Sequence, residues 1–365
     1  MGAGKFPSLL FIDTIKKGSA TMTALDSVQD GSPAMNTGTG PTPKSVRPFR
    51  LFGWAILAIM AAYLLNNYLT YWQDLPGIAP IYGGAANGAL PIVWSWFQLA
   101  VYVGFLAVAI VYVMRSQTPL RVDSARISSI NTFIIRTAFF AVLIVGLVDS
   151  AISFLRIEEL LPAVVGQGLA DELGKSRFRG AYVHMPLIAL SFVIAAFTRT
   201  LGFTWLALLV VVAELLIVIG RFILSYEQAF MADLVRFWYA ALFLFASAYT
   251  LLEEGHVRVD VFYAGLKPKT RGYVNAVGSV FLGMALCATI LAIGMGGKQN
   301  VINAPILSYE TTQAGFGLYV KYLMAGFLGV FAVTMMIQFV SYFMDAVADV
   351  RGEPGGRDHD SHAAH

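Results

Sequence analysis

The stretch Glu253-Glu254-Gly255-His256-Val257-Arg258-Val259-Asp260 is a dense polar octet in a chain that is otherwise mostly apolar. An uncharged and mainly apolar run, residues 237–252, leads directly into it, and another long apolar run begins near Tyr273. A helix needs ~20 apolar residues to cross the hydrocarbon core of a bilayer. The octet, residues 253–260, is therefore predicted to be the turn between two membrane helices.

The composition of the whole chain is typical of a membrane protein. Of its 365 residues, 57% are hydrophobic and only 13% are charged, and the mean hydropathy is +0.68; soluble domains carry about 25% charged residues. In hydrocarbon, every backbone N–H and C=O group must be paired within a helix or a closed barrel. Because the apolar runs are long and continuous rather than alternating, the sequence predicts an all-α, polytopic membrane helical bundle.

The apolar runs predict about eight transmembrane helices. They cover residues 51–71, 92–114, 132–155, 182–198, 202–220, 233–252, 272–297 and 318–345. The fourth and fifth runs are separated by so few residues that they form either a tight helical hairpin or one bent element. The polar segments at the two ends, residues 1–50 and 348–365, are predicted to be disordered, because they cannot bury enough apolar surface to offset the entropy of ordering.

The distribution of basic residues predicts the topology. If the N-terminus is cytoplasmic, the cytoplasmic segments hold sixteen Lys and Arg residues and the outer segments hold six. Cytoplasmic loops of membrane proteins carry the excess of Lys and Arg. We therefore expect both termini, and the octet with them, to lie on the cytoplasmic side.

Several ionisable residues fall within the predicted spans, where they are costly and usually face the bundle interior. The deepest is Glu214, and Arg136 and Asp149 share the third span. Glu214 is either an ion or proton relay or a carboxylate paired with a basic residue of a neighbouring helix or partner subunit. Asp233 and Arg236 are three positions apart, so they can pair on one helix face.

The chain lacks the common sequence signatures of an enzyme. It has no phosphate-binding glycine loop with a lysine, no HExxH and no CxxC, and its one cysteine, Cys287, excludes an intramolecular disulfide and a Cys-based metal cluster. We predict no catalytic residue, no cofactor, no metal site and no nucleic-acid partner. Without a nucleotide site, uphill transport has to draw on an ion gradient or on another subunit.

Residues 202–347 resemble the small membrane subunit (DctQ-like) of tripartite ATP-independent periplasmic (TRAP) transporters. The residues that carry the resemblance are, in chain order, Arg221-Phe222, Tyr226-Glu227-Gln228-Ala229-Phe230-Met231-Ala232-Asp233-Leu234-Val235-Arg236, Ala246-Ser247-Ala248-Tyr249, Glu254-Gly255-His256-Val257-Arg258-Val259-Asp260 and residues 266–271. The string from Gly255 to Asp260 is the most specific. The usual subunit is only this four-helix unit, so we expect a DctQ-like unit at 201–347 and an N-terminal membrane extension of about four helices at 51–200.

The resemblance implies a function and partners. It implies a small permease subunit that braces the large membrane subunit for sodium-coupled, binding-protein-dependent uptake of an organic acid or similar solute. The implied partners are the large TRAP membrane subunit, a periplasmic solute-binding protein and the lipid bilayer. The implied location is the bacterial inner membrane, and no enzymatic activity is implied. The alternative is a self-sufficient carrier or channel, with Glu214, Asp149 and Arg136 lining a path.

Eight polar residues are candidates for a subunit interface or a structural network. Arg258 can bind a carboxylate with two hydrogen bonds, and Gly255 allows the preceding helix to end without steric strain. The alternative for the octet is a solvated loop that merely sets the topology. The candidates are Glu254, Gly255, His256, Arg258, Asp260, Arg221, Asp233 and Arg236.

Overall fold

The computed structural model describes most of the chain between Val46 and Gly355. The described residues are 46–83, 89–199, 203–223, 225–226, 229–252, 263, 265–311 and 317–355. The chain divides into two units, Thr42–Gly352 and a second made of Met1–Pro41 with Glu353–His365, and every helix below belongs to the first. Within the described residues all regular structure is helical, which confirms the predicted all-α fold.

Eight helical stretches correspond one to one with the eight predicted spans. Seven are long and apolar enough to cross a membrane. They are α2 (Arg47–Tyr71), α3 (Ala89–Arg115), α4 (Leu120–Ile157), α7–η3–α8 (Ser176–Arg179, Gly180–His184 and Met185–Phe197), α10 (Ala229–Leu252), α11–η4–α12 (Pro268–Gly278, Ser279–Met284 and Ala285–Met295) and α14 (Lys321–Arg351). The remaining one, α9 (Phe203–Phe222), has 20 residues. At 1.5 Å per residue it is ~30 Å long, the thickness of the hydrocarbon core.

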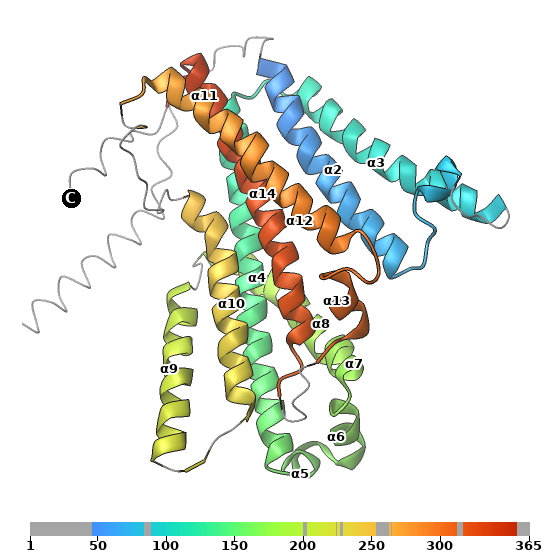
Figure 1. The fold of residues 1–365 in the computed structure, drawn as a ribbon, viewed down its shortest axis with the longest axis vertical. Helices are drawn as coiled ribbons and strands as arrows, with labels where there is room; N and C mark the ends of the chain where they lie inside the picture. The colour runs from blue at the N-terminus through green and yellow to red at the C-terminus, as the bar shows by residue number, and fades with distance from the viewer. Residues whose placement is uncertain are drawn as a thin grey trace, which may run out of the picture. The chain divides into compact units, whose positions relative to one another are not determined.

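Successive long helices run in alternating directions along the bundle (Figure 1). The helix α2 begins and α14 ends at the same end, where α11 also begins. The short helices α5 (Leu161–Val165) and α6 (Gln167–Leu173) lie at the opposite end, while α13 (Asn303–Ser308) lies nearer the middle, just beyond the end of α12. The fourth and fifth predicted spans correspond to two separate helices, α8 and α9; whether they form a tight hairpin stays a prediction.

The helix α4 occupies the centre of the bundle, where it packs against α8, α10 and α14. It has 38 residues, so it is ~57 Å long and exceeds the hydrocarbon core. Its apolar side joins Phe139 and Val142 to Phe237 of α10 and Phe327 of α14. Gly146 permits the close approach of α10, because a Cβ there would lie 2.3 Å from Trp238 Nε1.

A second side of α4 carries a polar seam that faces α14. Three of its members are one or two turns apart on α4 and three are correspondingly spaced on α14, and all six are buried. Asn131 Nδ2 donates to Thr334 O at 3.0 Å and to Gln338 Oε1 at 3.1 Å. Such bonds hold helices together where water is absent. The seam consists of Ser124, Ser128, Asn131, Thr334, Gln338 and Ser341.

Replacing Asn131 with alanine is expected to cause a small loss of stability, because it removes two hydrogen bonds to α14. Interhelical bonds of this kind contribute about 0.6 kcal/mol on average and about 1.7 kcal/mol at most. The control is Thr132→Ala, since Thr132 Oγ1 bonds only to Ser128 O of its own helix, at 2.9 Å. Thermal unfolding in mild detergent should show a lower midpoint for Asn131→Ala than for Thr132→Ala; equal midpoints would refute a role for the seam.

Candidate functional site

The carboxylate of Asp149, on α4, is the centre of a buried cluster of hydrogen bonds. Asp149 is fully buried, and its Oδ1 accepts from Arg179 Nη1 and from His184 Nε2, both at 3.0 Å. Its Oδ2 accepts from the backbone N–H of Tyr319 at 2.9 Å. Both oxygen atoms are thus satisfied by groups from two other parts of the chain, the α7–η3 stretch and Tyr319.

The guanidinium of Arg179 is satisfied on all sides. Its Nε and Nη2 donate to Leu173 O at 3.0 and 2.8 Å, and its Nη1 also donates to Ser153 Oγ at 3.1 Å. The ring of Tyr319 lies against it, with the ring centroid 4.2 Å from Cζ. A buried ion pair is tolerated only when its remaining hydrogen-bonding groups are satisfied, and Asp149 and Arg179 meet that condition.

His184 extends this cluster to α14. It is fully buried, its Nδ1 lies 2.8 Å from Tyr322 Oη, and the two rings are nearly parallel at an angle of 15°. If Nε2 carries the proton, it donates to Asp149 and Nδ1 accepts from the Tyr322 hydroxyl, so a neutral imidazole satisfies every group. With the charges of Asp149 and Arg179 cancelling, the cluster is then neutral overall. We call Asp149, Arg179, His184, Tyr319 and Tyr322 the Asp149 network.

A local irregularity of the helix brings Arg179 and His184 together. They are five residues apart, and the π-helical turn η3 connects them. In a π-helix residues i and i+5 are hydrogen-bonded neighbours, so both side chains reach Asp149. Gly180 allows this segment to lie against the ring of Tyr309, because a Cβ there would be 2.3 Å from that ring.

A second buried network lies where α2 begins. Arg50 Nε donates to Asp123 Oδ2 at 2.6 Å, and both side chains are buried. Arg50 also donates to Ser116 O at 2.7 Å and to Thr118 Oγ1 at 2.7 Å, and Trp54 Nε1 donates to the same Asp123 oxygen at 3.1 Å. This Arg50 network joins α2, the α3–α4 connection and α4.

The C-terminal part of the chain matches one protein family. Residues 207–349 match the DctQ component of the tripartite ATP-independent periplasmic transporters. Residues 207–349 belong to the DctQ family. No curated protein and no solved structure matches the chain. The match runs from within α9 to within α14 and confirms the resemblance found in the sequence. The DctQ family is a transporter component and not an enzyme family.

The boundary of the DctQ domain runs through the Asp149 network. Tyr319 and Tyr322 belong to the DctQ domain, whereas Asp149, Arg179 and His184 belong to the extension that precedes it. The polar seam crosses the same boundary, from α4 to α14. Residues Thr42–Gly352 accordingly form one compact unit. Hydrogen bonds from Tyr319 to Asp149 and between Tyr322 and His184 therefore join the domain to the extension.

Five of the predicted site residues lie outside the described residues. They are Glu254, Gly255, His256, Arg258 and Asp260. The helices that flank them are described: α10 ends at Leu252 and α11 begins at Pro268. A role for the octet in a subunit interface therefore stays a prediction.

The other three predicted interface residues lie at the ends of α9 and α10. Arg221 is exposed in the last turn of α9. Asp233 and Arg236 form the expected local pair, with Asp233 Oδ1 3.8 Å from Arg236 Nη1, and the Arg236 side chain is 73% exposed. Surface pairs of this kind contribute at most about 1 kcal/mol.

The three charged residues of the predicted transport path are not brought together. Arg136 Nη1 donates to Ala195 O, near the end of α8, at 3.3 Å. It is thirteen positions from Asp149 on one helix, a separation of ~20 Å along the axis. Glu214 was expected to face the interior but lies exposed on α9. The structure thus does not assemble the residue set of the self-sufficient carrier.

The sequence alone does not reveal most members of the two networks. Arg50 and Arg179 lie outside the predicted spans, and nothing in their sequence neighbourhood sets them apart from ordinary loop charges. Asp149 and Arg179 are 30 positions apart, and Asp149 and Tyr319 are 170 apart. A buried Asp within a span does signal an unassigned basic partner, but nothing in the sequence identifies which Arg it is.

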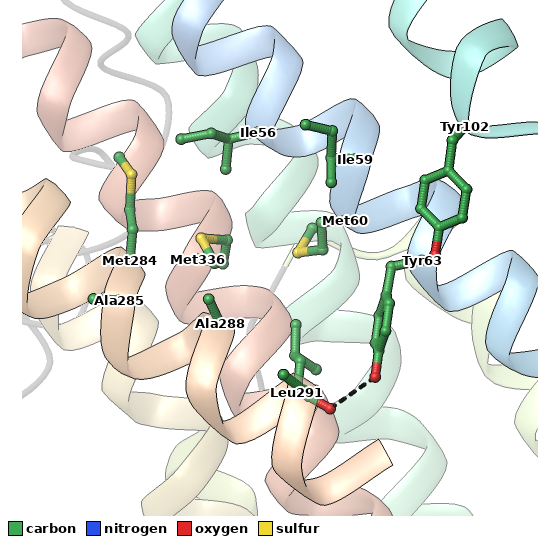
Figure 2. Close-up of a pocket in the computed structure, with 11 residues that line it drawn as sticks. Ile56, Ile59, Met60, Tyr63, Tyr102, Met284, Ala285, Ala288, Leu291 and Met336 are labelled. Carbon is green, nitrogen blue, oxygen red and sulfur yellow. Dashed lines mark hydrogen bonds between the residues drawn. The ribbon is translucent and has the colours of Figure 1, made fainter. Parts of the chain in front are cut away.

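An apolar groove of about 390 Å³ lies between the extension and the DctQ domain. Ile59 and Met60 of α2 form one wall, and Met336 of α14 and Ala288 of α12 lie across from them (Figure 2). Tyr63 Oη donates to Leu291 O at 3.0 Å and bridges the two sides. No charged residue lines this groove, and no group of three His, Cys, Asp or Glu residues in the described part of the chain is placed to hold a metal ion.

Proposed function

We propose that this chain is the small membrane subunit of a TRAP transporter and that it braces the large membrane subunit. The observation that carries the proposal is the match of residues 207–349 to the DctQ component. The transporter would take up an organic acid or a similar solute, coupled to sodium and dependent on a periplasmic solute-binding protein, in the bacterial inner membrane.

The way the charges are buried supports a bracing role. A brace must keep its helices fixed while a partner moves, and buried polar networks whose members are all satisfied make a structure more rigid and more specific. The Asp149 network and the Arg50 network lie toward opposite ends of α4. In this proposal neither network takes part in moving the solute.

The extension has a structural role in the same proposal. The central helix α4 belongs to the extension and packs against α10 and α14 of the DctQ domain. In the rest of the extension, α8 packs against α4, α2 packs against α14, and α3 packs against α2. We infer that the extension widens the fixed scaffold and covers one side of the DctQ domain.

Co-purification tests the proposed function. The tagged chain is expressed together with a large TRAP membrane subunit from the same genome, extracted in mild detergent and isolated through the tag. We expect the two subunits to be recovered together, and sodium-dependent uptake in liposomes to require both of them and the binding protein. Recovery of the tagged chain alone, or uptake by the tagged chain alone, would disprove the subunit role and favour the self-sufficient carrier.

A further inference from the structure

Glu214 is the exception among the acidic residues of the membrane helices. It lies eleven residues after the start of α9 and eight before its end, and its side chain is exposed. Asp123 and Asp149 are each paired with a buried arginine of this chain. In the described part of the chain, the carboxylate of Glu214 makes no hydrogen bond and no ion pair.

The surroundings of Glu214 on α9 are apolar and exposed. Val211, Leu215 and Val218, within one turn of it, are all exposed. On its inner side α9 packs against α10, through Leu206 and Ala213. The outer side would leave a carboxylate in contact with lipid hydrocarbon, which is unfavourable enough that intramembrane acidic residues almost always have a partner.

We propose that the outer face of α9, centred on Glu214, is where the large membrane subunit docks, and that a basic side chain of that subunit pairs with Glu214. This inference rests on the proposed function, since it takes the large subunit as the partner. Charge complementarity specifies the contact: an unpaired carboxylate at mid-membrane depth requires a cation at the same depth.

The arrangement of the extension favours the same face. The extension covers other sides of the DctQ domain, with α4 against α10 and α14 and α2 against α14. The helix α9 lies at the edge of the bundle, on the side away from α2 and α3 (Figure 1). A large partner can therefore approach α9 without displacing the extension.

Reversing the charge of Glu214 tests the contact. The tagged full-length chain carrying Glu214→Lys is co-expressed with the same large subunit, and the recovered large subunit is quantified. We expect a loss of about ten-fold or more, because the new cation faces the partner's cation. The control is Val103→Lys, which places a lysine at an exposed position near the middle of α3. Recovery with Glu214→Lys equal to that of the control would overturn the docking face.

Photo-crosslinking keeps the inference testable if Glu214→Lys does not fold. Benzoylphenylalanine placed at Val218, one turn from Glu214, leaves the carboxylate intact. We expect a crosslink to the large subunit from Val218 and none from Val103. A crosslink from Val218 only to a second copy of this chain, or no crosslink, would overturn the docking face. Failure of the unaltered chain to co-purify with the large subunit would instead refute the proposed function itself.

Discussion

Replacing Asp149 with alanine is expected to destabilise the protein by about 3–5 kcal/mol, the usual cost of removing one partner of a buried ion pair. The variant leaves the Arg179 guanidinium buried without its counter-charge. It also removes the acceptor for His184 Nε2 and for the backbone N–H of Tyr319. We expect a much lower thermal midpoint in mild detergent and a large aggregated fraction on size-exclusion chromatography.

Two further variants separate this effect from a general sensitivity to charge changes. Glu172 pairs with Lys175 at 2.6 Å, but the side chains are 44% and 63% exposed, so Glu172→Ala should cost at most about 1 kcal/mol. Combining Asp149→Leu with Arg179→Met should recover much of the lost stability, because apolar residues of similar volume often replace a buried pair without loss. Equal midpoints for Asp149→Ala and Glu172→Ala would contradict the importance of the Asp149 network.

The second large effect is expected for Arg50→Met, which leaves Asp123 as an unpaired buried carboxylate. The expected cost is again about 3–5 kcal/mol, because Arg50 is the only basic partner of Asp123 in the described part of the chain. Thermal unfolding of the purified protein measures it. Arg115→Met, at the exposed end of α3, serves as the control and should leave the midpoint nearly unchanged. A similar midpoint for Arg50→Met and Arg115→Met would rule out a stabilising Arg50 network.

The positions of the membrane helices could be predicted from the sequence. The thickness of the hydrocarbon core sets the length of a membrane helix, and the side chains along that length must be mostly apolar. The start of α4 differs from the predicted start of the third span. The span was predicted from residue 132, but α4 begins at Leu120. The intervening turns carry Ser124, Ser128 and Asn131, which read as polar in the sequence but are buried against α14.

The start of the fourth span differs in the same way, since it was predicted at residue 182 but lies at Ser176. Arg179 reads as a loop charge, yet it is fully buried because Asp149 neutralises it. Hydropathy assigns each residue a value that is independent of its contacts, whereas the free-energy cost of burying a charged side chain depends on whether it has a partner of opposite charge. The partners here come from α4, η3 and the start of α14, so only the folded chain brings them together.

The domain organisation shows a further difference. The sequence predicts an extension at 51–200 and a four-helix unit at 201–347, and this division stays a prediction; the family match covers residues 207–349. In the folded chain both parts belong to one compact unit, Thr42–Gly352. The reason is the central position of α4, which supplies one side of the polar seam and the carboxylate of the Asp149 network.

The central claim is that the extension and the DctQ domain are one folded body joined by buried polar contacts. The most direct measurement uses a specific protease site inserted between Arg199 and Phe203 of the full-length chain. After purification in mild detergent and cleavage, the two fragments are separated on a size-exclusion column. We predict that they elute together as a single species of unchanged size; elution as two separate species would contradict the claim.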